Sequence, residues 1–344
     1  MMRTSGKVTK WLLVLGMLHG IILCAGFLAP YDPVHQDREH PYVRPMMLHF
    51  VDARGDFHLR PFFYSFDPRG NGSAAAEEDA ARPVALKFLI KGETYRLGGL
   101  IPCSRHLFGA EQARIYLLGT DGYGRDQLSR FLYGGQISLL AGLLGAGITL
   151  FFGLLAGATA GYYGGWRDTL LMRLAELFLA LPWLYLLLGL RAFLPLNVSP
   201  VMAFLLIVIV IATVGWARPA RLIRGIVLSA KERDFVRAAR GFGASDAYLF
   251  RRHVLPETSS VLVTQAAILI PQYVLAEMTL SFLGLGVPQP IASWGNLLAD
   301  LEHYSVLVSC WWMYLPALIM LPFFVGYLGL ASSLHRTDSH NIFA

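Results

Sequence analysis

The stretch "KERDFVRAARGFGASDAYLFRRHVLPE" (Lys231–Glu257) is a polar, arginine-rich segment set between two long apolar runs. The 344-residue chain around it is 55% hydrophobic and only 15% charged, whereas soluble domains are about 25% charged. This composition predicts a polytopic membrane protein. The quoted segment is then a loop that leaves the membrane between two spans.

Six apolar runs are each long enough, at about 20 residues, to cross about 30 Å of hydrocarbon as a helix. They are Trp11–Ala29, Ile137–Gly161, Thr169–Leu190, Pro200–Trp216, Thr258–Leu283 and Val306–Ala331. The turn "RAFLPLNVSP" separates the third run from the fourth. The first run also resembles the apolar core of a secretory signal peptide. Its length, the lack of a small-x-small cleavage site before Pro30 and the five later runs favour a retained membrane helix.

The basic residues predict the topology, because short loops rich in Lys and Arg stay in the cytoplasm. Residues 217–256 carry nine Lys or Arg residues against three acidic residues, and the N-terminus adds Arg3, Lys7 and Lys10. The loop 284–305 has no Lys or Arg. With six spans, both termini and the 217–256 loop are predicted to be cytoplasmic.

The segment after the first span is predicted to be a small extracytoplasmic subdomain that contains β-structure. Two β-rich runs surround the turn-forming sequences "DARGD" and "KGE", which indicates hairpins, and residues 67–83 between them indicate a polar loop. The subdomain either binds a substrate or partner, or caps the outer face. The predicted regions are a tail and first span (1–29), an insertion with an interfacial helix (30–136), a transmembrane core (137–335) and a cytoplasmic tail (336–344).

The second run is rich in glycine, and small residues let membrane helices approach closely. Its glycines include Gly142, Gly145, Gly153, Gly157 and Gly161. We expect this helix to pack tightly in a bundle, with the lining of a pathway as the alternative.

The familiar signatures of catalysis are missing from the sequence. It holds no GxxxxGK[ST] phosphate loop, no HExxH and no clustered metal ligands. No enzyme activity, cofactor, metal or nucleic-acid partner is predicted for this chain. A membrane enzyme built on the outer loop, around His49, His58 and His106, is the competing class.

The loop itself is predicted to be two short helices joined by a turn. Phe235, Ala238, Ala239 and Phe242 fall on one helix face. Gly241 and Gly243 can end that helix, Ser245 or Asp246 can cap the next one, "AYLFRRHV", and Pro256 suits the first turn of the following span. Such a bracket either docks another protein on its alanines or lies on anionic lipid.

The residues "VRAARGFGASDAYLFRRHVLP" resemble the EAA loop of ATP-binding-cassette importer permeases. That loop has the pattern Glu-Ala-Ala, three residues, Gly, nine residues, a hydrophobic residue, any residue and Leu-Pro. Arg237 replaces the Glu and His253 replaces the hydrophobic residue. The matching positions are Ala238, Ala239, Gly243, Leu255 and Pro256. The resemblance implies that this loop, 231–256, docks on a separate ATPase subunit, and Arg237 puts any contact made by the family's Glu in doubt.

Two further segments are similar to signatures of the C-type permeases of the dipeptide, oligopeptide and nickel family. They are "LLGTDGYGRDQLSRFLYGGQISL" (117–139) and "LAEMTLSFLGLGVPQPIASWGNLL" (275–298). In the first segment we expect Thr120 or Asp121 to cap a short helix at the outer membrane surface, with an Asp126–Arg130 pair along it. Its motif residues are Gly119, Thr120, Asp121, Gly124, Arg125 and Asp126.

Glu277 lies among apolar residues of the fifth predicted span. A carboxylate inside the membrane costs free energy, so Glu277 should face the bundle interior, a watery cavity or a partner. Contact with a substrate amine or cation and hydrogen bonding near a subunit interface are both consistent with this position. Trp294, after the helix-breaking "GLGVPQP", is expected to be an interfacial anchor.

Taken together, the resemblance implies an all-α permease with six spans, the type I importer fold, in a bacterial inner membrane. It implies a heterodimer with a homologous permease, two ATPases that bind ATP and Mg, an extracytoplasmic solute-binding protein and contact with lipid. Peptides are the implied cargo. Nickel or another small solute, and an export or structural role, are the alternatives.

Overall fold

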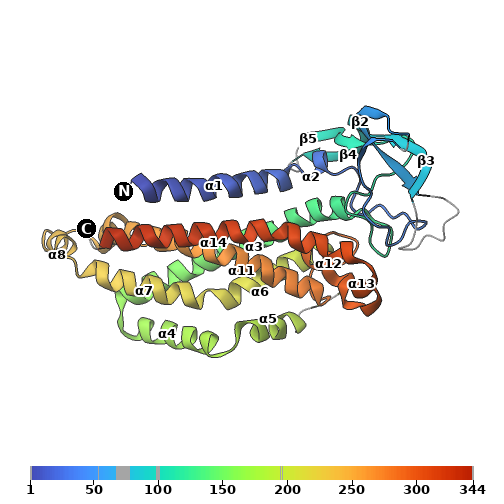
Figure 1. Ribbon diagram of the computed structural model, residues 1–344. Helices are drawn as coiled ribbons and strands as arrows, with labels where there is room; N and C mark the ends of the chain where they lie inside the picture. The colour runs from blue at the N-terminus through green and yellow to red at the C-terminus, as the bar shows by residue number, and fades with distance from the viewer. Residues whose placement is uncertain are drawn as a thin grey trace. The chain divides into compact units, whose positions relative to one another are not determined.

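The computed structural model describes residues 2–342 except 53, 67–77, 98–100, 194 and 196 (Figure 1). The chain divides into two compact units. The first comprises Met1–Val14, Leu139–Glu277 and Phe323–Ala344, and the second comprises Leu15–Ser138 and Met278–Pro322.

Among the described residues, four helical segments are long and apolar enough to cross a membrane alone, and two bent helix pairs raise the number to six if each pair is one span. The four are α1 (Met2–Leu23), α3 (Gln127–Tyr163), α11 (Ser259–Phe282) and Trp311–His335, which joins η3 (Trp311–Tyr314) to α14 (Leu315–Ile342). The pairs are α4 (Gly165–Ala180) with α5 (Trp183–Ala192), and α6 (Pro200–Gly215) with α7 (Ala217–Lys231). The six predicted apolar runs fall on these six segments.

The third predicted span is not one straight helix. Its two halves, α4 and α5, meet at 92°. Leu181 is extended, with φ −92° and ψ 142°, because the ring of Pro182 disfavours a helical conformation in the residue before it. The prediction of a continuous helix over Thr169–Leu190 was therefore wrong.

The last span also begins and ends differently from the prediction. Residues Tyr304–Ser309 form a separate short helix, α13, and the spanning segment begins only after Cys310. At the other end α14 continues to Ile342. The predicted tail, 336–344, is therefore largely helical backbone.

In the first unit α3 lies against α7 along its glycines. A Cβ atom added at Gly157 would lie 2.4 Å from the Ala220 carbonyl oxygen of α7, closer than any side chain tolerates. The same turn of α7 supplies the buried side chain of Ile223. Close packing of small residues is the expected basis of helix association in a membrane, so this finding confirms the packing interpretation of the second run.

Helix α4 is also attached to α7. The Arg224 guanidinium of α7 donates to both carboxylate oxygens of Asp168 in α4, with Nε–Oδ1 and Nη2–Oδ2 distances of 2.5 and 2.6 Å. A bidentate pair fixes the relative orientation of the two groups as well as their distance. Helix α7 is therefore the common support of α3 and α4.

We predict that Gly157→Ala destabilises the chain by about 1–3 kcal/mol, because the added methyl group must push α3 and α7 apart. Gly147→Ala is the matched control, since a Cβ atom at Gly147 would meet nothing within 4 Å. Thermal unfolding of the two variants in detergent measures the difference. Equal melting temperatures would contradict the close contact.

The second unit holds the predicted β-structure, in two small sheets. One has the strand order β1-β2-β3 and the other pairs β4 with β5, and all pairs are antiparallel. The strands are β1 (His49–Val51), β2 (Phe57–Phe66), β3 (Glu78–Ala85), β4 (Lys87–Leu97) and β5 (Ile101–Gly109). Phe63, Phe108 and Tyr116 are among the buried side chains of the local core.

The first predicted hairpin is confirmed, because β1 and β2 pair on either side of "DARGD". The second was wrong: "KGE" lies inside β4, which pairs with β5 instead of folding back on itself. Of the predicted polar loop 67–83, residues 67–77 lie outside the described residues and the rest belongs to β3. The remaining short helices of this unit are α2 (Ala25–Leu28), α12 (Trp294–Leu298), η2 (Ala299–Glu302) and α13.

Candidate functional site

The arginine-rich loop forms the predicted helix–turn–helix bracket, in the first unit. Gly243 has φ +84° after the first helix, a conformation that glycine adopts without strain. The Ser245 hydroxyl accepts a hydrogen bond from the Tyr248 N–H and so caps the second helix. The elements are α8 (Asp234–Gly241), α9 (Asp246–Leu249), a π-helical turn η1 (Phe250–Val254) and α10 (Leu255–Glu257).

The second helix departs from the prediction in one respect. Residues 250–254 form a π-helical turn instead of continuing as a regular α-helix. Pro256 follows at the start of α10 and has no N–H to donate to a carbonyl of the preceding turn. Such turns are single-turn insertions into an α-helix, often at functional sites.

The inner face of the bracket is held by apolar contacts. Val236, Leu249 and Val254 are buried, one in each of α8, α9 and η1. Val254 belongs to a core cluster with Ala158 of α3 and with residues of α7 that include Val227. The bracket therefore rests on the same two helices that the glycine contact joins.

Polar contacts fix the ends of the bracket. Arg233 donates to Glu257 at 2.8 Å and so joins the start of α8 to the end of α10. The Tyr162 hydroxyl of α3 donates to the Asp246 carboxylate at 2.7 Å and accepts from Arg240 at 3.3 Å. The Arg233–Glu257 and Tyr162–Asp246 contacts join residues that lie 24 and 84 positions apart in the sequence. A local sequence pattern therefore does not indicate that Tyr162 of α3 contacts the bracket.

The outer face carries the residues that the sequence singles out. Phe235, Arg237 and Ala238 are exposed, and Phe242 keeps 93% of its surface accessible. Within the described part of the chain, no ion pair or hydrogen bond is formed by the Arg237 guanidinium. Ala239 is half-buried, Pro256 is exposed, and Leu255 lines a pocket behind the bracket.

His253 takes the place of a hydrophobic residue by packing at an angle against two aromatic rings. Its ring centroid lies 5.5 Å from that of Phe235 and 5.8 Å from that of Tyr248. An imidazole ring between two aromatic rings fills the volume of an apolar side chain and keeps its flat shape. The departure from the family pattern at this position therefore preserves the packing.

The second set of predicted residues, in the second unit, forms a buried charge network. Arg125 Nε donates to Asp121 Oδ2 at 2.7 Å, and the Asp121 carboxylate also accepts the N–H groups of Tyr123 and Arg125. Arg130 Nε lies 3.4 Å from the same oxygen of Asp121. All three charged side chains are almost fully buried.

Helix α3 is capped differently from the prediction. The cap is Asp126, whose Oδ2 accepts from the N–H and the hydroxyl of Ser129 at 2.8 and 2.6 Å. Thr120 is used elsewhere: its hydroxyl accepts from the Val43 N–H and donates to the His40 carbonyl. The predicted Asp126–Arg130 pair was wrong, because Asp126 is taken up by capping and Arg130 turns to Asp121.

This region is also not a separate helix at the membrane surface, because it leads directly into the single helix α3. The turn before α3 contains Gly119 and Gly124, both at positive φ. A Cβ atom at Gly124 would lie 1.7 Å from the Asp37 carbonyl oxygen, so glycine is required there.

The two signature segments meet in this network. Arg125 Nη1 donates to Gln289 Oε1 at 2.5 Å, and Arg130 Nη2 donates to Asn296 Oδ1 at 3.1 Å. Asn296 also forms a capping box with Ser293 at the start of α12. Neither Gln289 nor Asn296 was predicted to be a site residue, although "SWGN" has the spacing of a capping box.

Trp294 is not an interfacial anchor. Its side chain is fully buried, its indole N–H donates to the Phe131 carbonyl at 3.0 Å, and its ring stacks on the Phe131 ring. Because the anchor prediction requires a ring at the membrane surface, it was wrong. The tryptophan is a core residue of the second unit.

We predict that Arg125→Met costs about 3–5 kcal/mol of stability, because removing one member of a buried ion pair leaves the Asp121 carboxylate uncompensated. Arg173→Met is the control, since Arg173 is 77% exposed in its pair with Glu176 and should cost less than about 1 kcal/mol. Denaturation in detergent compares them. A loss in Arg125→Met no larger than in the control would contradict the network's role.

Burial has a measurable effect on the acid that caps α3. It raises the pKa of Asp126 to about 6, while the hydrogen bonds from Ser129 oppose the rise. Burial also raises the pKa of Asp300. The folded chain therefore holds a proton on Asp126 at a pH where the unfolded chain has lost it.

We predict that Asp126 makes stability fall as pH rises from about 4, the usual carboxyl pKa, to about 6, and adds no further change above that range. The unfolded state ionises first in this window, so rising pH favours unfolding. Asp126→Asn removes this contribution. Melting temperatures of the two proteins across the window test it, and parallel curves would contradict the prediction.

Glu277 is fully buried in α11, as its energetic cost in lipid requires. The three histidines of the rival hypothesis are used structurally. The imidazole nitrogens of His106 lie 2.6 and 3.0 Å from the Ala29 and Glu93 carbonyl oxygens, His49 packs on Phe62 and Tyr64, and His58 pairs with Asp52. The described residues contain no group of three His, Cys, Asp or Glu that could hold a metal ion.

Comparison with known proteins gives consistent matches. Residues 151–337 match the family model described as "Binding-protein-dependent transport system inner membrane component". A peptide permease protein of Brucella suis is 37% identical over 214 residues, which cover 61% of this chain and 69% of the relative. The dipeptide transport system permease protein DppC of Bacillus subtilis is 36% identical over 200 residues, 58% of this chain and 60% of the relative. The structure described as "Crystal structure of an amino acid ABC transporter with histidines" aligns with a TM-score of 0.43 at 20% identity, over 61% of this chain and 94% of that chain.

Proposed function

Because the chain belongs to the family of binding-protein-dependent transport system inner membrane components, we propose that it is the permease subunit of an ATP-driven importer. It is a multi-pass membrane protein with a small β-containing insertion. The observation that carries the proposal is the bracket, whose inner face is buried on α3 and α7 and whose outer face exposes Phe235 and Phe242.

The bracket is the coupling element in this proposal. Its exposed face, Phe235, Arg237, Ala238 and Phe242, docks on an ATPase subunit that binds ATP and Mg. Its anchored face passes the movement to α3 and α7, so that the spans move as largely rigid bodies between inward- and outward-open states. Ala239, Gly243, Leu255 and Pro256 shape and seat the bracket without themselves forming most of the exposed face.

The assembly that we propose has a homologous permease as the second half of the pathway, two ATPases and an extracytoplasmic solute-binding protein. The basic loop and both termini lie in the cytoplasm, in keeping with the charge distribution. The β-containing subdomain then lies outside, where it is available to the binding protein. Glu277 is proposed to face the pathway or the permease interface.

Peptides are the cargo that we propose. The support is the description of the relatives as peptide and dipeptide permeases. Identification of the ligands that copurify with the solute-binding protein tests the cargo. Recovery of nickel or another small solute in place of peptides would overturn it and leave the coupling mechanism intact.

We predict that Phe235→Ala with Phe242→Ala lowers ATPase association by about tenfold or more, because two exposed aromatic anchors leave the interface. Phe193→Ala is the control, since Phe193 is 90% exposed at the end of α5 and lies outside the bracket. Copurification and ATP-driven uptake in vesicles measure the effect.

Gly243→Val tests the same surface by strain and bulk, because Gly243 has positive φ and open space around it. Both association and uptake should fall. Normal values for this variant and for the double alanine variant would contradict docking through the bracket.

A further inference from the structure

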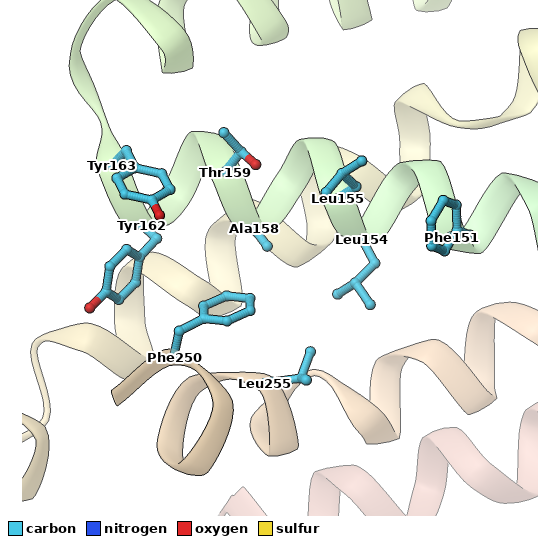
Figure 2. A pocket seen from close by; sticks show the side chains of 9 residues that line it. All are labelled: Phe151, Leu154, Leu155, Ala158, Thr159, Tyr162, Tyr163, Phe250 and Leu255. Carbon is cyan, nitrogen blue, oxygen red and sulfur yellow. The ribbon is translucent and has the colours of Figure 1, made fainter. Parts of the chain in front are cut away.

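A pocket of about 360 Å³ lies between α3 and the bracket, within the first unit (Figure 2). In Figure 2, Phe250 and Leu255 point from the bracket side toward α3, with Tyr162 and Tyr163 at one end and Phe151 at the other. The nine lining residues are Phe151, Leu154, Leu155, Ala158, Thr159, Tyr162, Tyr163, Phe250 and Leu255. Its volume lies in the range of small-molecule sites.

The two ends of the pocket differ in chemistry. From Phe151 to Ala158 the α3 side is entirely apolar, whereas the other end carries the two tyrosines. That end coincides with Tyr163, where the span α3 stops, and Trp166 follows, 72% exposed. Tyr and Trp gather where hydrocarbon meets headgroups. These residue types indicate that the tyrosine end of the pocket lies at headgroup depth and that its apolar end lies in the hydrocarbon.

Cationic groups stand at the tyrosine end. The Arg167 guanidinium carbon lies 5.0 Å from the Tyr163 ring centroid, and Arg240 donates to the Tyr162 hydroxyl. The nearby carboxylates have partners already: Asp246 accepts from Tyr162, and Asp168 is held by Arg224. Arg167 has no carboxylate partner among the residues that the structure describes.

We propose that this pocket binds an anionic phospholipid, with an acyl chain along Phe151–Ala158 and the phosphate at Arg167 and Tyr163. Basic pockets between membrane helices bind such headgroups, and guanidinium groups suit phosphate oxygens. This binding is independent of the proposed transport function.

The bound lipid would contact the coupling bracket directly. Phe250 belongs to η1 and Leu255 to α10, so the acyl chain packs against the last part of the bracket, next to α11. An occupied pocket adds apolar contacts that hold the bracket on α3. Lipid composition then sets how firmly the bracket is seated.

The test uses the full chain in nanodiscs and a phosphatidylglycerol probe with a photoreactive acyl chain. We expect crosslinks in peptides that contain residues 151–163 and 250–255. Labelling should fall about tenfold or more in Arg167→Gln, because a charge-assisted hydrogen bond contributes about 1.5 kcal/mol or more. Arg167→Lys should keep part of it, and Arg173→Gln, an exposed charge elsewhere on α4, should keep all of it.

Leu154→Trp provides a second arm, because it fills the pocket and leaves both arginines in place. It should abolish labelling of the 151–163 peptide while the melting temperature shows that the chain is folded. Equal labelling by a phosphatidylcholine probe, or full labelling of Leu154→Trp or Arg167→Gln, would overturn the proposal. Competition by inorganic phosphate as effective as that by unlabelled phosphatidylglycerol would also overturn it, since free phosphate would then be the ligand.

Discussion

The close approach of α3 and α7 is the contact on which the first unit depends. At Gly157 the two backbones are separated by less than the width of a methyl group, so the pair behaves as one support. Membrane helices gain little from the hydrophobic effect when they associate, because lipid is as apolar as their side chains. Close backbone contact and dispersion therefore provide the stabilisation that burial of apolar surface provides in water. The bracket, the Asp168–Arg224 pair and the apolar pocket are all built on this support.

The second unit uses the opposite strategy, a buried network of charges. Asp121, Arg125 and Arg130 are costly to desolvate, and their attraction only offsets that cost when hydrogen bonds complete the set. Gln289 and Asn296 accept hydrogen bonds from the guanidinium groups of Arg125 and Arg130, from a segment more than 150 residues away in sequence. The network therefore favours one pairing of the two segments over alternatives. A purely apolar contact of the same area would be less selective.

Much of this arrangement could be predicted from the sequence, because it follows from local or one-dimensional patterns. The lengths of the apolar runs predicted the spans. The helix-capping residue Ser245, the helix-ending Gly243 and the first-turn Pro256 predicted the bracket. Errors arose where a tertiary partner competes with a local one. Arg130 pairs with Asp121 and not with Asp126, the acid one helical turn before it. Trp294 donates its indole N–H to a backbone carbonyl inside the protein and does not lie at the membrane surface.

Other features could not be predicted, because a sequence pattern does not decide between two local structures that it fits about equally well. "KGE" is a plausible turn and an acceptable strand, and its pairing with β5 decided the outcome. The bend at Pro182 could have been predicted, because proline disfavours a helical conformation in the residue before it. The continuous apolar run across this position favoured the wrong prediction of one straight helix. Tyr162 and the pocket around it depend on contacts across more than 80 residues, for which the sequence carries no local mark.

The π-helical turn in the bracket sets a rotational register. A regular α-helix advances by about 100° per residue, and a π turn accommodates one residue more than an α turn in nearly the same length. Deleting one residue between Phe250 and Val254 would let the segment relax to an α-helix. The residue removed is the one that the wider turn absorbs, so the segments on either side would keep nearly the same rotation relative to each other. Phe235 and Phe242 would then keep about the same direction relative to the membrane span α11. The π-helical turn is thus a place where the chain can absorb a one-residue change in length while the exposed face of the bracket stays aimed at the same partner surface.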